Sequence, residues 1–143
     1  MAATIDWIGV GLACLVLLIV LVLAGMVLRR RLIARGEPMA LVAVARGEDG
    51  WQLGMTRLTT HNVQWFALVG LGLRPARVWA RGELDLGSPA QITGNRPIAI
   101  MDPVQVDCSA DGSTFRIAVA RGDYTALRSW SESAPPGRGV NVA

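Results

Sequence analysis

WIGVGLACLVLLIVLVLAGMVL, the stretch from Trp7 to Leu28, carries no charged side chain along its 22 residues. A helix of that length reaches roughly 33 Å at about 1.5 Å of rise per residue, enough to cross a hydrocarbon core of about 30 Å. Fourteen of its residues are Val, Ile or Leu. Each of these favours insertion by about 0.3 to 0.6 kcal/mol. The stretch therefore predicts a transmembrane helix over residues 7–28.

The charges that flank this stretch lie on one side of it. Residues 1–6 contain no Lys or Arg, and the basic residues follow the span at Arg29, Arg30, Arg31 and Arg35. Basic residues beside a span remain on the cytoplasmic side. We therefore expect an integral, single-pass protein of the cell (plasma) membrane, with an extracytoplasmic N-terminus at residues 1–6 and a cytoplasmic C-terminal domain.

The same four arginines lie where the chain meets the membrane surface. An anionic inner leaflet attracts each such charge by about 1 kcal/mol. Contact with anionic lipid is therefore one interpretation of the cluster, and a topology signal alone is the other.

The rest of the 143 residues has room for one compact domain. The net charge of +3 is due mainly to the four arginines directly after the span. Residues 51–133 contribute little, because they hold eight Arg against seven Asp and Glu. A nearly neutral domain argues against nucleic acid as a partner. All 14 basic residues are Arg, so chemistry that needs a Lys, such as a Schiff base, is excluded.

The boundaries of the domain follow from changes in composition. The helix is expected to continue past the membrane and to stop at Gly36, because Pro38 follows it. We assign residues 29–50 to a basic juxtamembrane linker, 51–133 to a β-rich domain with a C-terminal helix, and 134–143 to a disordered tail. Within the linker, the apolar run Met39–Ala45 fits either a strand or a covered connection.

From Trp51 onwards the sequence alternates between apolar and polar residues, which is typical of half-buried strands. Asp111 and Gly112 indicate a tight hairpin, and Pro103 indicates a bulge or an edge. Ser88 and Pro89 are expected to close the fourth strand. The predicted strands are residues 51–58, 63–69, 77–80, 83–86, 97–101, 104–108 and the run after Gly112, with Phe115, Ile117 and Val119 facing inward and Thr114, Arg116 and Ala118 facing outward.

A helix is predicted over residues 122–133, with Asp123 as its cap and Tyr124, Leu127 and Trp130 on one face. The fold class is therefore one N-terminal transmembrane α-helix plus a small mainly-β domain. Six or seven strands followed by one amphipathic helix match the order of a pleckstrin-homology-like bent sheet or barrel. Another small β-barrel or meander with a terminal helix fits equally well.

Three segments carry a family resemblance: Gly50 and Trp51, LGLRPARVWARGELDL from Leu71 to Leu86, and RGDYTALRSW from Arg121 to Trp130. They resemble the actinobacterial single-pass membrane proteins of domain-of-unknown-function family 2550. The resemblance covers nearly the whole chain, including the span. It implies the layout given above and no catalytic residue.

Residues able to carry chemistry are sparse. His61 is the only histidine, and Cys108 is the only cysteine outside the predicted span. A nucleophilic pair of the two is conceivable, but Cys108 lies on the apolar face of a predicted strand. Glu83 and Asp85 lie two apart on one strand face, where a solvated edge is the usual explanation. We predict no catalytic residue, no metal site and no cofactor.

One cluster in the domain is a candidate contact for anionic lipid or an acidic partner, namely Arg74, Arg77 and Arg81. The alternative is an exposed Arg face whose stems pack over apolar surface. The function expected from the sequence is a membrane-anchored, non-enzymatic interaction module, a scaffold or accessory subunit with a protein partner at the cytoplasmic face. The alternatives are an anionic-lipid headgroup-binding domain and an enzyme of unknown type.

The predicted orientation can be tested by thiol labelling in intact cells. A membrane-impermeant maleimide should label a cysteine introduced at Ala2 and should not label one introduced at Gly139, because the basic residues hold the C-terminal side in the cytoplasm. Cells permeabilised before labelling provide the control for Gly139. The reverse labelling pattern would overturn the cytoplasmic assignment.

Overall fold

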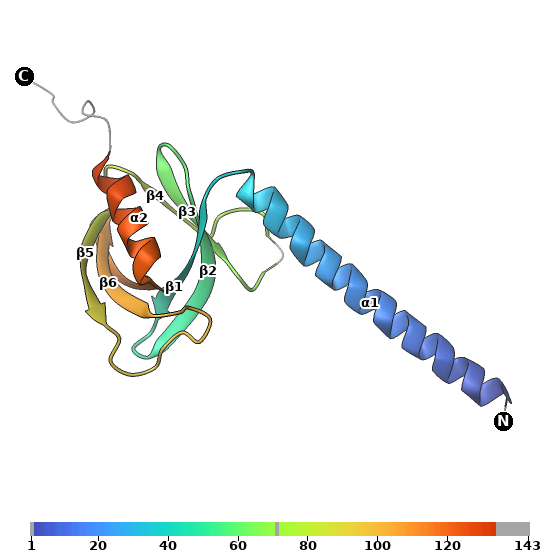
Figure 1. Cartoon of the computed structure of the whole chain (residues 1–143). Coiled ribbons are helices and arrows are strands. Elements are labelled where there is room, and N and C mark those ends of the chain that lie inside the picture. The colour runs from blue at the N-terminus through green and yellow to red at the C-terminus, as the bar shows by residue number, and fades with distance from the viewer. Residues whose placement is uncertain (1, 71, 134–143) are drawn as a thin grey trace, which may run out of the picture. The chain divides into compact units, whose positions relative to one another are not determined.

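The computed structural model describes residues 2–70 and 72–133, so the tail predicted at 134–143 lies outside the described residues. The chain divides into two compact units, of which the first ends at Arg35 and the second begins at Gly36. Figure 1 shows one long helix and a β domain that carries a short helix.

The first unit is the helix α1, Ala2–Ala34. Within its segment Trp7–Ala34, the 18-residue window that is most apolar has a mean hydropathy of 3.1, and the helix is long and apolar enough to cross a membrane. Arg35 and Gly36 have φ values of 44° and 81°, a left-handed conformation that ends an α-helix. The predicted stop at Gly36 is thus confirmed.

The second unit is a seven-stranded antiparallel sheet followed by a C-terminal helix, so the predicted fold class is confirmed. The strand order is β4-β3-β2-β1-β7-β6-β5. The elements are β1 Met39–Arg46, β2 Gly50–Leu58, β3 Asn62–Ala67, β4 Arg77–Ala80, β5 Asp85–Gln91, β6 Pro103–Ala110, β7 Ser113–Ala120 and α2 Arg121–Glu132.

The strand β1 corrects the predicted boundary of the domain. Residues 39–46 lay within the predicted linker, yet β1 pairs with β2 on one side and with β7 on the other. Val42, Ala43 and Val44 are buried, because a strand at the centre of the sheet is covered on both faces. The folded domain therefore begins near Gly36 rather than at Trp51.

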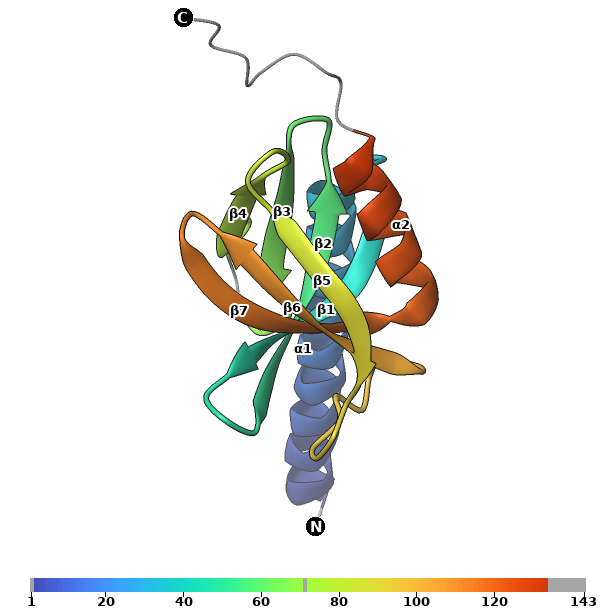
Figure 2. The same cartoon turned by 90° about the vertical axis from the view of Figure 1, so that its left-hand side faces the viewer.

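The pairing of β1 with β7 joins two meanders into one bent sheet. β1 to β4 follow one another on one side of this seam, and β7, β6 and β5 follow on the other. Figure 2 shows β5 and β6 running obliquely across the direction of β2 and β3. The outermost strands are β4 and β5, and the side chains of Trp79 on β4 and Phe115 on β7 stack with ring centroids 4.9 Å apart.

The inner face of the sheet holds the main core, in which Trp65 is the largest fully buried side chain. Its indole donates a hydrogen bond of 3.0 Å to the carbonyl oxygen of Val42 on β1. Between these two strands lies Gly54 of β2, which is paired with Val42. A Cβ at Gly54 would lie 2.3 Å from the Trp65 ring. Gly54 therefore leaves the space that the indole crosses.

A second, smaller cluster covers the outer face of the seam. Ala43 and Ala118 are buried there beneath Ile92 and Ile100 from the segment between β5 and β6. Ala118 was predicted to face outward, and it does face away from the main core, but this segment covers it. The strand predicted at 97–101 is wrong, because this segment is irregular and anchors itself through Ile100.

Two further boundaries differ from the prediction. β5 does not close at Ser88 and Pro89 but continues to Gln91, with an irregular register between Leu86 and Pro89. Pro89 is tolerated because β5 is an edge strand. Asp123 is not the cap of α2, because the helix begins directly after β7 at Arg121 and its N-cap residue is Ala120.

The hairpin at residues 111 and 112 and the packed face of α2 are confirmed as predicted. Pro103 marks neither a bulge nor an edge, because it begins β6, an inner strand that pairs with both β5 and β7. Asp111 and Gly112 form the hairpin between β6 and β7, with φ values of 52° and 74°. Tyr124 and Leu127 are buried against the sheet, and the Trp130 indole donates a hydrogen bond of 2.9 Å to the Thr59 carbonyl oxygen. In Figure 1, α2 lies beside β5 and β6.

The contact between Gly54 and Trp65 gives a stability prediction. Gly54→Ala should lower the free energy of unfolding by about 2 to 3 kcal/mol, because the buried indole is held by its hydrogen bond and has no room to move. Gly82→Ala is the matched control, since a Cβ there meets no atom within 4 Å. Denaturant titration of the detergent-solubilised chain, followed by tryptophan fluorescence, measures both. Equal effects of the two substitutions would contradict the crossing of the indole over β2.

Candidate functional site

The three arginines predicted to form one patch lie in three different surroundings. Arg74 is exposed in the connection between β3 and β4. Arg77 is exposed at the start of β4, and Arg81 is partly buried in the turn after β4. They therefore have to be considered one by one.

Arg81 is bound to the C-terminal end of α2. Its guanidinium donates hydrogen bonds of 2.9 and 2.6 Å to the Trp130 carbonyl oxygen and one of 2.7 Å to the Ser133 hydroxyl. It also donates to the Thr60 carbonyl oxygen at 3.2 Å and lies 4.8 Å from the centroid of the Trp130 ring. The last carbonyl groups of a helix lack partners within the helix. Arg81 supplies one, so its contacts support the fold.

Arg77 lines an open hollow of about 690 Å³ on the β domain. Arg116 of β7 and Asp107 of β6 also line it, together with Gly47 from the connection between β1 and β2. Arg116 is held in place by a hydrogen bond of 3.2 Å to the Glu48 carbonyl oxygen. Two guanidinium groups against one carboxylate leave a net positive charge, which suits an anionic group.

Sequence reasoning missed Arg116, which was taken as an outward-facing residue of its strand and no more. The signal lay in the hairpin register. A tight turn at Asp111 and Gly112 pairs Ala110 with Ser113 and, three pairs further, Asp107 with Arg116. What no local pattern shows is the approach of Arg77, which comes from a strand on the other side of the β1–β7 seam.

The four arginines of the juxtamembrane cluster all belong to the end of the first unit. Arg29, Arg30 and Arg31 lie on the last turns of α1, and Arg35 follows its end. Arg30, Arg31 and Arg35 are exposed. Three of the four arginines thus lie on the same helix as the apolar segment.

The candidate nucleophile Cys108 is unreactive in this surrounding. Its side chain is buried in the main core, and burial raises the pKa of the thiol to about 12, assisted by the charges of Asp107 and Asp85. His61 is exposed in the connection between β2 and β3. Among residues 2–70 and 72–133, no group of three or more His, Cys, Asp or Glu side chains is arranged to hold a metal ion.

The carboxylate predicted to accompany Asp85 has a different partner. The pKa of Glu83 is raised by a side-chain hydrogen bond with Asp111 and by the negative charge of that residue. Glu83 lies in the turn after β4, whereas Asp111 lies in the hairpin between β6 and β7. Both residues are exposed, and Glu83 does not share a strand face with Asp85 as predicted, because β5 begins only at Asp85.

Large apolar side chains are exposed in the two longer connections of the sheet. Ile98 and Met101 belong to the connection between β5 and β6, and their exposed fractions are 101% and 88%. Val69 and Leu73 belong to the connection between β3 and β4. Exposed apolar side chains that gather in one segment are typical of interaction surfaces.

The connection between β5 and β6 is held firmly while it exposes these side chains. Two of its own residues, Ile92 and Ile100, are buried against the sheet. The Trp51 indole donates a hydrogen bond of 2.8 Å to the carbonyl oxygen of Asn95, which also belongs to the connection. Asp102 at its end forms an ion pair of 3.1 Å with Arg121. Ile98 and Met101 are therefore presented on a fixed scaffold.

The different surroundings of Arg81 and Arg77 predict different effects on stability. Arg81→Ala should lower the free energy of unfolding by about 2 kcal/mol, because the end of α2 loses its charged hydrogen-bond donor. Arg77→Ala should change it by less than about 0.5 kcal/mol, since Arg77 is an exposed surface residue. Urea titration of the two variants in detergent checks the difference. Similar losses would contradict the structural role of Arg81.

Comparisons with known proteins give a family and little else. No curated protein matches the chain. One solved structure that resembles it is described as "A Systematic Screen for Protein-Lipid Interactions in Saccharomyces cerevisiae", with 14% identity, a TM-score of 0.42, and coverage of 68% of this chain and 90% of that chain. A likeness this distant carries no argument about fold or function. The sequence profile of a family described as "Protein of unknown function (DUF2550)" matches residues 15–137. The chain therefore belongs to the DUF2550 family.

Proposed function

We propose that this protein is a membrane-anchored, non-enzymatic interaction module that binds a protein partner at the cytoplasmic face of the cell membrane. The anchor is α1, and the arginines at its end favour the orientation with the β domain in the cytoplasm. Family membership adds no activity, because the function of the family is unknown.

One observation carries the choice of a protein partner. The connection between β5 and β6 is anchored by Ile92 and Ile100 and exposes Ile98 and Met101 completely or nearly so. Exposing these side chains has no benefit for the isolated fold, because their burial would stabilise it by about 1.5 kcal/mol or more each. A fixed apolar protrusion is suited to a pocket or groove on another protein.

The chemistry of the side chains supports a non-enzymatic role. The Cys108 thiol is protonated at neutral pH, because its pKa is about 12. The carboxyl pair of Glu83 and Asp111 is exposed to solvent, and no buried base or nucleophile lies in the hollow lined by Arg77 and Arg116 as far as its described residues show.

The test is purification of the tagged full-length chain from its host in mild detergent. A partner retained by the native chain should be lost when Ile98→Ser and Met101→Ser are combined, because both substitutions remove the apolar protrusion. Leu73→Ser is the matched control, since Leu73 is exposed in the other long connection. A stoichiometric partner would indicate a subunit of a complex, and several substoichiometric partners would indicate a scaffold. Unchanged retention in the double variant would contradict the protrusion as the contact.

A second function, recognition of an anionic lipid headgroup, is favoured by the hollow between Arg77 and Arg116. The strand order and the C-terminal helix also suit a pleckstrin-homology-like domain, in which a bent sheet is closed by a helix. Arg74 and the cluster from Arg29 to Arg35 would add charge to such a contact.

This alternative is separated from the first by calorimetry on the full-length chain in zwitterionic nanodiscs. Glycerophosphoinositol phosphate serves as the soluble probe. We expect no saturable heat at physiological salt, because the domain is nearly neutral overall. Saturable binding that disappears in the Arg77→Ala and Arg116→Ala double variant, and persists in Arg74→Ala, would make lipid recognition the preferred function.

A further inference from the structure

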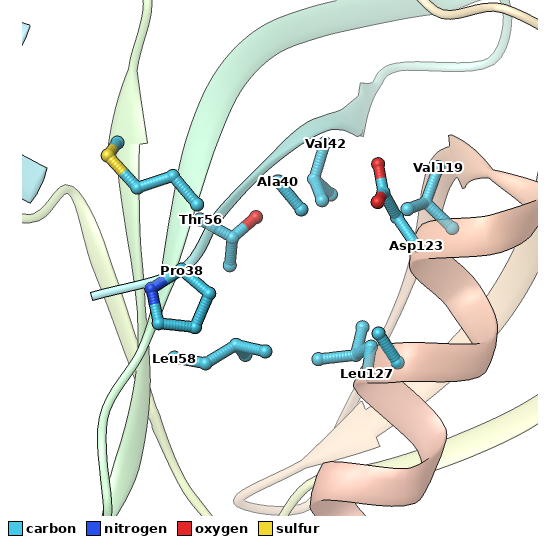
Figure 3. Close-up of a pocket in the computed structure, with 10 residues that line it drawn as sticks. Pro38, Ala40, Val42, Thr56, Leu58, Val119, Asp123 and Leu127 are labelled. Atoms are coloured by element: carbon cyan, nitrogen blue, oxygen red, sulfur yellow. The ribbon is translucent and has the colours of Figure 1, made fainter. Parts of the chain in front are cut away.

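A small pocket lies between α2 and the beginning of the sheet, on the β domain itself. Its volume is about 80 Å³. Most of its lining is apolar and comes from the start of β1, the end of β2, the end of β7 and the first turns of α2. Figure 3 shows the apolar side chains of Val42, Leu58, Val119 and Leu127 around this space.

Two polar groups interrupt the apolar lining, and they come from opposite walls. The Thr56 hydroxyl lies on the β2 wall and the Asp123 carboxylate on the α2 wall, and both point into the space between them in Figure 3. Thr56 is 98% buried, since its exposed fraction is 2%. Within the described part of the chain, its Oγ1 atom has no hydrogen-bond partner.

An unpartnered buried hydroxyl is a departure from the usual rule. Buried polar atoms almost always form a hydrogen bond, because losing the hydrogen bond to water without replacement costs about 1 to 3 kcal/mol. Valine has nearly the shape of threonine and would remove this penalty. A hydroxyl at this position therefore indicates a ligand that supplies the missing hydrogen bond.

The charge of the pocket indicates the kind of group that completes it. Asp123 is its one charged lining residue among those described, and no ion pair of Asp123 with another described residue is formed. A cation that donates hydrogen bonds satisfies both polar groups at once, because a carboxylate and a hydroxyl oxygen can each accept one. The lining includes no Arg, so a ligand that carries phosphate finds no basic partner here.

The size and the lining narrow the cation further. A space of about 80 Å³ has room for two or three water-sized groups, since each takes about 30 Å³. The ammonium of a lysine side chain and its last methylenes fill such a space, and the rest of its four-methylene stem packs along the apolar walls. All 14 basic residues of this chain are Arg. A second copy therefore has no lysine to offer.

We propose that this pocket binds a lysine side chain of a partner protein, with its ammonium group between Asp123 and Thr56. This rests on the proposed function, in which the partner is a protein. The apolar walls hold the methylene stem, the Asp123 carboxylate forms the ion pair, and Thr56 Oγ1 accepts one ammonium hydrogen. The pocket then acts as a specificity site for lysine beside the apolar protrusion at Ile98.

The experiment uses the full-length chain in nanodiscs with ¹³C-labelled methyl groups. Nα-acetyl-lysine methylamide is the probe, and its norleucine analogue, which lacks the ammonium, is the neutral control. We expect saturable shifts of the Thr56 and Leu127 methyl signals with the lysine probe only. Asp123→Asn should weaken binding at least about tenfold, as the loss of a charged hydrogen bond does. Glu132→Gln also replaces a carboxylate of α2 by an amide, but it lies outside the pocket lining. It should leave binding unchanged.

Thr56→Val provides a readout that does not depend on Asp123. It should weaken binding of the lysine probe and at the same time raise the unfolding temperature, because the buried hydroxyl no longer lacks a partner. A lower unfolding temperature would show that the hydroxyl stabilises the fold and would overturn its assignment to a ligand.

Three other outcomes would overturn the lysine site. Equal binding of norleucine and lysine probes would leave an apolar pocket without charge recognition. Shifts that stay linear with concentration would show no site at all. Tighter binding of glycerophosphoethanolamine than of the lysine probe would assign the pocket to an aminolipid. The proposed function is judged separately, because capture of a partner through Ile98 and Met101 is measured without the probe and with Asp123 intact.

Discussion

The pairing of β1 with β7 is the constraint on which the rest of the domain depends. It consists of Val42 with Val119, Ala43 with Ala118 and Val44 with Ile117. β1 and β7 are the first and the last strand in the sequence, although they lie inside the sheet. Their pairing therefore brings the beginning and the end of the domain together. α2 starts directly after β7 and is placed by this pairing against the start of β1. The pocket between α2 and β1 is a consequence of the same geometry.

Small residues make this arrangement sterically feasible on both faces of the sheet. On the outer face, Ala43 and Ala118 leave room for Ile92 and Ile100 to pack directly on the seam. On the inner face, Gly54 leaves room for the Trp65 indole to reach the Val42 carbonyl oxygen. The hydrogen bond from Trp65 and the packing of the two isoleucines both involve residues of β1. The seam is therefore held from two sides by groups that are distant in the sequence.

Much of the architecture follows from local patterns. The apolar run that forms α1 and the turn at Asp111 and Gly112 were correctly predicted, because both depend on residues that are neighbours in the chain. The role of Met39–Ala45 within the predicted linker was undecided, since a strand covered on both faces has no alternation to reveal it. The strand predicted at 97–101 failed for a related reason. Ile100 is apolar because it packs on Ala43 and Ala118, which is a long-range contact.

The candidate sites show the same division between local and distant information. Arg74, Arg77 and Arg81 looked like one patch by spacing alone, but the end of α2 lies over Arg81 and takes up its hydrogen-bond donors. Arg116 and Asp123 were both noted in the sequence. The residues that line the same hollow or pocket, Arg77 with Arg116 and Thr56 with Asp123, lie on distant strands. No pattern of spacing along the chain reports such neighbours.

Partnership of polar groups separates structural residues from candidate functional ones. Arg81 is a charged residue whose donors meet carbonyl oxygens of the same domain, so the fold itself explains its presence. Thr56 is the opposite case, because its hydroxyl is more deeply buried and meets no acceptor or donor among the described residues. A polar group that the fold leaves unsatisfied is retained against its energetic cost. In this domain that group lies opposite a carboxylate, in a pocket that residues of α2 and of the first strand line together.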